Sequence, residues 1–320
     1  MSPEPTSIVL IVGGILAALA GALHIYQRYS GEHPILDLLY DRRIRQLDLA
    51  TLDRQNADNT RRSDLVITLT TLPSRIGRIG PTIKSLLNQT CAAREIRLNV
   101  PQMSRRERRP YVVPDWLGRL RSVTIVPCED HGPATKLIPS VVGAQPNDRV
   151  LVVDDDRIYH PYLVEQMAAL SDANPDVAIA GSGWDAPGDL IDRPTTLVAT
   201  LLGRAPAPIK CTRVGRAREV DIMQGLGGYL VKPRFFDVSA LADYRAAPDA
   251  AFFVDDVWIS AHCRARKVVY PGRRTNFPSR RDARFYKRSS VALVNRGTGT
   301  PASRNNTIML QFFKDRWRAH

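Results

Sequence analysis

The residues best suited to chemistry are three consecutive carboxylates, Asp154, Asp155 and Asp156, which directly follow an apolar run at residues 150–153. Adjacent carboxylates repel one another, so a globular protein neutralises them or leaves them in solvent. The apolar run is typical of a buried parallel strand, and open α/β sheets bind ligands at the carboxyl ends of such strands. Hard oxygen ligands there favour Mn²⁺ or Mg²⁺ shared with a substrate phosphate. The alternative is an acidic turn that only caps the next helix.

A second acidic pair, Asp255 and Asp256, opens a predicted helix at residues 257–266. Negative charge stabilises a helix N-terminus, so the pair has a purely structural interpretation. Its chemical interpretation is general-base catalysis, in which a carboxylate takes the proton of an attacking hydroxyl. We expect the helix dipole to keep such a carboxylate ionised.

Short β-branched runs alternate with helical patterns through the middle of the chain. This alternation predicts an α/β fold with a mainly parallel, Rossmann-like sheet and helices on both faces. The predicted strands cover residues 64–70, 95–100, 122–127, 149–154 and 177–181, and the predicted helices 80–88, 133–142 and 161–171.

An N-terminal transmembrane helix is predicted at residues 7–26, which carry no formal charge when His24 is neutral. Their length suffices to cross the hydrocarbon core of a bilayer. A cleaved signal peptide is the alternative, but no Lys or Arg precedes the segment, so we expect an uncleaved single-pass anchor. Because Arg28, Arg42, Arg43 and Arg45 follow it, the positive-inside rule places the rest of the protein in the cytoplasm.

The 320 residues divide, by pattern, into an anchor at 1–30, a juxtamembrane helical stalk at 31–60, a catalytic domain at 61–270 and a basic C-terminal extension at 271–320. Residues 307–317 of the extension form a predicted amphipathic helix, for which packing on the domain is favoured over lying on the membrane. The four cysteines are scattered singly, which argues against a disulfide framework or a zinc site.

The net charge of +13 is concentrated late in the chain. A diphosphate substrate, anionic lipid headgroups and nucleic acid are the partners that could explain it, besides a merely solvated basic face. No nucleic-acid-binding motif is visible, so we expect no nucleic-acid partner. The cluster comprises Arg273, Arg274, Arg280, Arg281, Arg284, Lys287 and Arg288.

Four segments, residues 70–75, 130–136, 154–156 and 255–258, follow one another in an order that resembles GT-A fold glycosyltransferases, similar to glycosyltransferase family 2. The resemblance covers residues 64–267. It implies that the triplet acts as the DxD motif, with Asp156 and Asp154 as metal ligands and Asp155 hydrogen-bonded to the ribose or the sugar. It also implies that the second pair supplies the catalytic base, Asp256 in first place and Asp255 in second.

The resemblance assigns further residues to substrate binding. Asp130, Gly132 and Lys136 belong to a loop beside the nucleotide, and Thr70 and Arg75 to a loop after the first strand. Trp184, Gln224 and Gly225 are candidates for shaping the sugar and acceptor pocket, with a core role equally open for Trp184. No QxxRW-type motif of processive synthases is present, which favours transfer of a single sugar.

These observations favour a membrane-anchored, metal-dependent, inverting glycosyltransferase that uses a nucleotide-sugar donor and a glycan or lipid-linked acceptor. A metal-dependent nucleotidyltransferase or nucleotide-sugar hydrolase needs the same carboxylates and metal, and it stays open. A non-catalytic tethered module that binds anionic lipid or glycan is the third interpretation.

Overall fold

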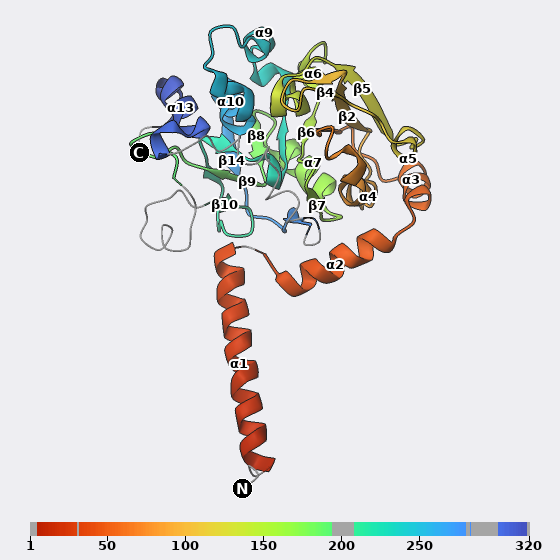
Figure 1. The fold of residues 1–320 in the computed structure, drawn as a ribbon, viewed down its shortest axis with the longest axis vertical. Coiled ribbons are helices and arrows are strands. Elements are labelled where there is room, and N and C mark those ends of the chain that lie inside the picture. Colours follow the sequence, from red (N-terminus) through yellow and green to blue (C-terminus); the bar gives the residue numbers. More distant parts are fainter. Residues whose placement is uncertain (1–4, 31, 194–207, 280–281, 283–299, 319–320) are drawn as a thin grey trace.

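The computed structural model describes residues 5–30, 32–193, 208–279, 282 and 300–318. Helix α1 (Pro5–Ser30) projects from a mixed α/β domain (Figure 1). Within it, Val9–Gln27 is long and apolar enough to cross a membrane, judged by length and composition. The predicted α/β class with a mainly parallel sheet is confirmed.

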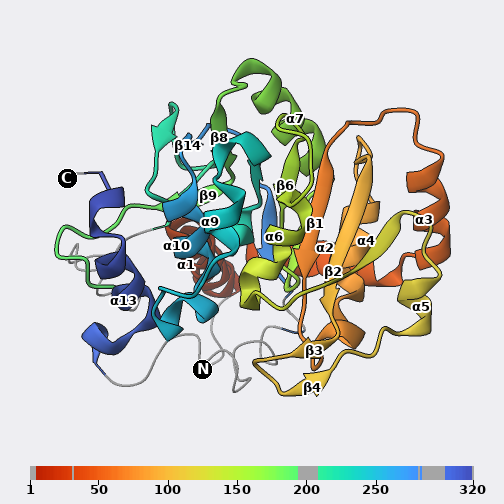
Figure 2. The same ribbon diagram turned by 90° about the horizontal axis from the view of Figure 1, so that it is seen from above.

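The main sheet has eight strands in the order β11-β14-β8-β13-β6-β1-β2-β5. In Figure 2, β14, β8, β6, β1 and β2 follow one another from left to right. Strand β1 pairs in parallel with β2 and β6, and β2 with β5, whereas β13 runs antiparallel between β6 and β8. The five predicted strands are all present. The bounds are β1 (Val66–Thr70), β2 (Glu95–Pro101), β5 (Val123–Cys128), β6 (Val150–Val152), β8 (Val177–Ala180), β11 (Arg218–Glu219), β13 (Tyr229–Val231) and β14 (Arg266–Val269).

Successive residues from Val150 to Val153 pack alternately in two hydrophobic cores, one on each face of the sheet. Val150 and Val152 belong to the core on one face of the sheet, and Leu151 and Val153 to the core on the other. Side chains alternate between the faces of a strand, so an unbroken apolar run is what a strand covered on both faces requires. The fully buried β6 therefore delivers the acidic triplet to the end of the sheet.

Helices cover both faces of the sheet. Those packed on the core of Val150 and Val152 are α6 (Ile138–Val141), α9 (Val238–Ala242), α10 (Asp255–His262) and α13 (Asn305–Phe312). Those on the other core are α3 (Leu49–Ala57), α4 (Gly80–Leu87), the short α5 (Asp115–Gly118) and α7 (Leu163–Ala173).

Three predicted helices differ from the structure. The one predicted at residues 307–317 is α13, which ends at Phe312, followed by a 3₁₀ turn, η7 (Lys314–Arg316). The helix predicted at residues 257–266 begins at Asp255 and ends at His262, because Arg266 already belongs to β14. The helix predicted at 133–142 is a 3₁₀ turn, η2 (Gly132–Lys136), followed by α6. Gly132 has a φ of +61°, which starts this tight turn where a longer helix was expected.

Smaller sheets surround the main one. Strand β7 (Arg157–Tyr159), which directly follows the acidic triplet in the chain, pairs with β15 (Asn276–Pro278) in a two-stranded ribbon. A three-stranded sheet has the order β10-β9-β12, and β3 pairs with β4. Their bounds are β3 (Met103–Ser104), β4 (Arg109–Pro110), β9 (Ser182–Trp184), β10 (Ile209–Lys210) and β12 (Ile222–Met223).

The segment predicted as a stalk forms two helices, α2 (Pro34–Gln46) and α3, and both pack against the domain. The Asp53 carboxylate of α3, for example, accepts hydrogen bonds from the backbone amides of Arg121 and Ser122. At the other end of the chain, Met309 and Leu310 of α13 are fully buried, so this helix packs on the domain. Of the predicted basic cluster, Arg280, Arg281, Arg284, Lys287 and Arg288 lie outside the described residues.

Candidate active site

A cavity of about 420 Å³ lies where the carboxyl ends of β1 and β6 meet η2 and the first turn of α10. The structure thereby brings together segments that are almost two hundred residues apart in the chain. Ten of the predicted site residues line it: Thr70, Arg75, Asp130, Gly132, Lys136, Asp154, Asp155, Asp156, Asp255 and Asp256.

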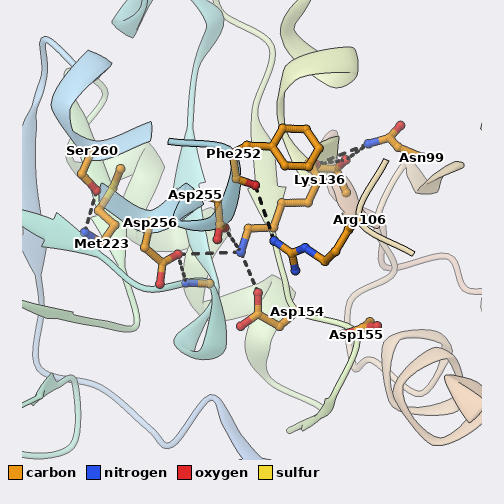
Figure 3. A network of polar contacts seen from close by, with 12 residues as sticks. Asn99, Arg106, Lys136, Asp154, Asp155, Met223, Phe252, Asp255, Asp256 and Ser260 are labelled. Atoms are coloured by element: carbon orange, nitrogen blue, oxygen red, sulfur yellow. Dashed lines mark hydrogen bonds and ion pairs between the residues drawn. The ribbon is translucent and has the colours of Figure 1, made fainter. Parts of the chain in front are cut away.

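The two acidic clusters meet at the ammonium group of Lys136 (Figure 3). Lys136 Nζ lies 2.7 Å from Asp154 Oδ1, 2.5 Å from Asp255 Oδ2 and 3.7 Å from Asp256 Oδ1. The lysine side chain is only 7% exposed. A buried ammonium is tolerated only with such compensation, and three carboxylates this close together need a cation between them.

The backbone of Lys136 is fixed from the sheet by two fully buried polar residues. Thr68 Oγ1 of β1 donates to the Lys136 carbonyl at 2.6 Å. Asn99 Nδ2 of β2 donates to the Thr135 carbonyl at 2.9 Å. Hydrogen-bonded polar groups inside a core specify one arrangement, because an unmade bond there is costly. Lys136 is therefore aimed at the carboxylates by the sheet itself.

Burial alone would lower the pKa of Lys136, but the charges of Asp154, Asp255 and Asp256 outweigh it and raise this pKa well above the ordinary lysine value. The ammonium is therefore permanently charged at physiological pH. Such a group can neutralise carboxylates or a phosphate oxygen, and it cannot serve as a general base.

Asp256 has the opposite electrostatics. Burial and then the charge of Asp255 raise the pKa of Asp256 to about 8, although Lys136 acts to lower it. The expectation that the helix N-terminus keeps this carboxylate ionised is thus wrong, because desolvation and like charge exceed the dipole effect. A carboxylate poised near neutral pH is matched to proton transfer.

The two members of the pair differ in access. The side chain of Asp255 is 14% exposed and that of Asp256 is 31% exposed, and both line the cavity. Asp255 is held in its short ion pair with Lys136, whereas Asp256 accepts a 3.1 Å hydrogen bond from the amide of Gly225. Asp256 is therefore the better placed of the two to meet a substrate.

The members of the triplet also have different surroundings. Asp155 is buried, accepts a 2.6 Å hydrogen bond from Thr71 Oγ1 and lies 3.3 Å from Arg75 Nη1. Burial raises the pKa of Asp155 to about 6, against the effect of Arg75. Asp156 is a third exposed and has a looser contact of 3.7 Å with Arg157. Asp155 thus fixes the loop after β1 through Thr71 and Arg75. Asp156 has the most exposed carboxylate of the triplet and is the most accessible to a ligand.

A divalent cation fits the cavity only together with a substrate. Among the described residues, no group of three or more His, Cys, Asp and Glu side chains is arranged to hold a metal ion by itself. Mg²⁺ in phosphate-binding sites needs only one or two carboxylates plus phosphate oxygens, and the partly exposed Asp154 and Asp156 supply these. The cavity wall carries six carboxylates and four cationic side chains, which are Arg75, Arg106, Lys136 and Arg157. Carboxylates outnumber cations, so a diphosphate entering the cavity needs additional positive charge.

Two glycines permit the close packing of the site. A Cβ on Gly225 would lie 2.4 Å from both Asp154 Oδ1 and Lys136 Nζ. A Cβ on Gly132 would lie 2.3 Å from the Phe252 carbonyl oxygen, at a φ of +61°. Any side chain at either position would displace the lysine, the carboxylate or the turn that carries them.

Three predicted pocket residues do not line the cavity. Gly225 lies next to it, with its backbone amide donating to Asp256 Oδ1 at 3.1 Å. Trp184 is 7% exposed within the core packed on α10, so of its two predicted roles the structure shows the core role. Gln224 does not line the cavity; its backbone N–H donates to the Ser182 carbonyl at 3.0 Å and so fixes the turn before Gly225.

Several wall residues were missed by sequence reasoning. Thr71 directly follows the predicted Thr70, and Arg106 lies in the basic run 105–109, so each had a signal nearby. Tyr111 and Ser279 had none, since they reach the cavity only through tertiary packing. Tyr111 does so by donating from its hydroxyl to the Thr71 carbonyl at 2.9 Å.

No protein-family model and no curated protein matches the chain. Its fold is similar to that of TarS 1-349 from S. aureus in complex with UDP-GlcNAc, at 13% identity and a TM-score of 0.41, over 67% of this chain and 58% of TarS. It is also similar to GalNAc-T7 with UDP, GalNAc and Mn²⁺ (12% identity, TM-score 0.41, 65% of this chain and 41% of that one). A third likeness is to 4-diphosphocytidyl-2C-methyl-D-erythritol synthase (12% identity, TM-score 0.41, 71% and 97%).

Glycosyltransferases of the GT-A type are thus among the structures that this chain resembles. The chain spans less than two thirds of the TarS chain that it matches, 58% of its length. At a TM-score of 0.41 these likenesses carry no argument about activity, which has to come from the cavity.

Proposed function

We propose that the chain is a membrane-anchored, metal-dependent glycosyltransferase that moves one sugar from a nucleotide-sugar donor to a glycan or lipid-linked acceptor, with inversion. One observation carries the proposal: two acidic clusters a hundred residues apart share one cavity and one buried cation, Lys136. Sugar transfer needs a binding site for the donor diphosphate and a general base for the acceptor hydroxyl. The acidic triplet would supply the first and the second acidic pair the other.

On the donor side, Asp154 and Asp156 would hold a divalent cation, Mn²⁺ or Mg²⁺, together with the donor diphosphate. When bound, this cation supplies positive charge against the charge that develops on the leaving diphosphate. Arg75 and Arg106 lie on the same wall and add further positive charge near the phosphates. Lys136 keeps Asp154 oriented through its 2.7 Å contact.

On the acceptor side, Asp256 takes the proton of the acceptor hydroxyl as its oxygen attacks the anomeric carbon. One carbon–oxygen bond forms to the acceptor while the bond to the diphosphate breaks, and the electron pair of that bond leaves with the diphosphate. A single displacement of this kind inverts the anomeric centre. The poised pKa and the cavity exposure of Asp256 support this role, and Asp255 supports it by raising that pKa.

The anchor is assigned to α1, whose Val9–Gln27 span has a mean hydropathy of 2.1. The basic residues that follow α1 support a cytoplasmic catalytic domain. A nucleotide-sugar donor made in the cytoplasm would then reach the cavity directly.

The proposal is tested by incubating the full chain in detergent or nanodiscs with a panel of nucleotide sugars, Mn²⁺, and total membrane lipid or glycan extract as acceptor. We expect transfer of radiolabelled sugar from one donor, and its loss in Asp256→Asn. Release of sugar phosphate with nucleoside monophosphate, or of free sugar with nucleoside diphosphate, at a rate that acceptor extract does not change, would support the hydrolase alternative. Formation of a nucleotide-sugar from a nucleoside triphosphate and a sugar phosphate would support the nucleotidyltransferase. Absence of all turnover with every donor would leave a binding module.

A further inference from the structure

Helix α2 buries carboxylate side chains and exposes aliphatic ones. Its buried stripe includes two carboxylates, Asp37 and Asp41, each 1% exposed. Asp37 forms a bidentate pair with Arg274 at 2.5 and 2.7 Å, and Asp41 pairs with Arg45 at 2.6 Å. Residues at i and i+4 share one helix face, so this helix turns two carboxylates toward the domain, together with the fully buried Ile44 near its end.

The outward face of α2 is apolar over its first turns. Ile35, Leu36, Leu38 and Leu39 are 55%, 58%, 48% and 57% exposed. A solvated helix normally shows the reverse arrangement, with aliphatic side chains on the core and charges outside. Four large aliphatic side chains gathered on one exposed face indicate a surface that is covered by something apolar.

Two features indicate what covers the exposed aliphatic face of α2. Helix α2 begins at Pro34, four residues after the end of α1 at Ser30, and in Figure 1 it runs along the side of the domain from which α1 emerges. On the same exposed surface, Arg42 and Arg43 follow the aliphatic residues. An apolar face beside basic side chains matches the boundary between acyl chains and anionic headgroups.

We infer that α2 lies in the plane of the membrane, with its aliphatic face at the acyl-chain boundary and Arg42 and Arg43 among anionic phospholipid headgroups. The inference rests on the proposed anchoring by α1 and goes beyond it: the anchor alone leaves the domain free to tumble, whereas α2 presses one side of it to the bilayer.

The docked helix reaches the active-site wall. Arg45 of α2 donates from Nη2 to Ser279 Oγ at 2.5 Å, and Ser279 lines the cavity. Arg274, the partner of Asp37, lies just before β15, and β15 pairs with β7, which directly follows the acidic triplet. The membrane-facing helix therefore holds the β7–β15 ribbon and fixes the cavity relative to the lipid surface.

The test places a tryptophan on each of two exposed positions of the full chain. Leu39→Trp reports on the outward face of α2, and Val142→Trp is the matched control, since Val142 is 54% exposed and follows α6, at the end of the domain remote from α2 in Figure 1. Each variant is reconstituted into vesicles of phosphatidylcholine and phosphatidylglycerol, with or without brominated acyl chains. The emission of the parent protein, which has four tryptophans, is subtracted.

We expect the added emission of Leu39→Trp to shift to shorter wavelength and to be quenched by brominated lipid, with neither effect for Val142→Trp. Replacing Arg42 and Arg43 by Gln in the Leu39→Trp background should lower the quenching in vesicles rich in phosphatidylglycerol. Equal insensitivity of the two tryptophans would overturn the inference. So would a blue shift without bromine quenching that grows with the protein-to-lipid ratio, since this indicates a second copy on the α2 face.

The readout requires no turnover, so it separates this inference from the proposed function. A chain that quenches as expected but transfers no sugar refutes the glycosyltransferase and leaves the docked helix standing. A chain that fails to float with vesicles refutes both α1 as anchor and α2 as docking surface.

Discussion

The raised pKa of Asp256, about 8, makes a quantitative prediction for the pH dependence of transfer. A general base works only when deprotonated, so kcat/KM should increase as the pH rises through this value. For a single group at about 8, the ionised fraction is about 9% at pH 7, about 50% at pH 8 and about 90% at pH 9. We therefore expect an increase of about five-fold from pH 7 to 8 and about two-fold from pH 8 to 9.

Substitution identifies the group that titrates. Asp256→Asn keeps the shape and removes the proton acceptor, so kcat/KM should fall by about 10² to 10⁴ and lose its rise with pH. Asp115→Asn is the matched control, because Asp115 also lies in the first turn of a helix, lines no part of the cavity and has an 89% exposed side chain. It should leave the profile unchanged.

The assay is initial-rate transfer of labelled sugar at subsaturating donor between pH 6 and 9.5, with Mn²⁺ held constant. A flat profile in the parent protein would refute the reasoning, as would a rise that survives in Asp256→Asn. If Asp255→Asn loses activity and Asp256→Asn does not, the base is the other member of the pair.

Further predictions concern the surroundings of this carboxylate. Lys136→Met removes the cation that lowers the pKa of Asp256, so any residual activity should rise at higher pH than in the parent protein. The same substitution leaves three carboxylates without their buried cation, so urea denaturation should show a free energy of unfolding lower by about 3 kcal/mol or more. EDTA should abolish transfer and Mn²⁺ or Mg²⁺ restore it, while Asp156→Ala should be folded by circular dichroism and inactive; full activity of Asp156→Ala in EDTA would contradict the metal role. Because the folded-state pKa of Asp256 lies above its unfolded value, its contribution to stability should decline as the pH rises from about 4 to about 8, so the melting temperature of Asp256→Asn should fall less over that range than that of the parent. A reporter fused after His320 should be cytoplasmic, and its protection across the membrane would reverse the topology.

The sequence was sufficient wherever a short segment carries its own physical signal. Residues 150–153 are apolar without alternation, which is what a strand buried on both faces requires, and β6 lies there with the acidic triplet at its end. The span of α1 was predictable for the same reason, since crossing a bilayer demands a continuous apolar run. That the two acidic clusters serve one site was implied only by the resemblance to GT-A enzymes, and in the structure both line one cavity.

Only the tertiary structure decided how those carboxylates behave. The pKa of Asp256 depends on Asp255, on Lys136 and on burial within a cavity whose walls come from distant segments, and no local pattern encodes that sum. The effect of the helix dipole, from which the sequence analysis expected an ionised carboxylate, has the opposite sign to the total. Likewise, the spacing of the leucines in α2 predicted only a helix. Their exposure became evident in the folded chain, where Asp37 and Asp41 are buried and paired with Arg274 and Arg45. Sequence determines which groups a segment brings, whereas distance and desolvation, which set the strength of each charge interaction, exist only in the folded chain.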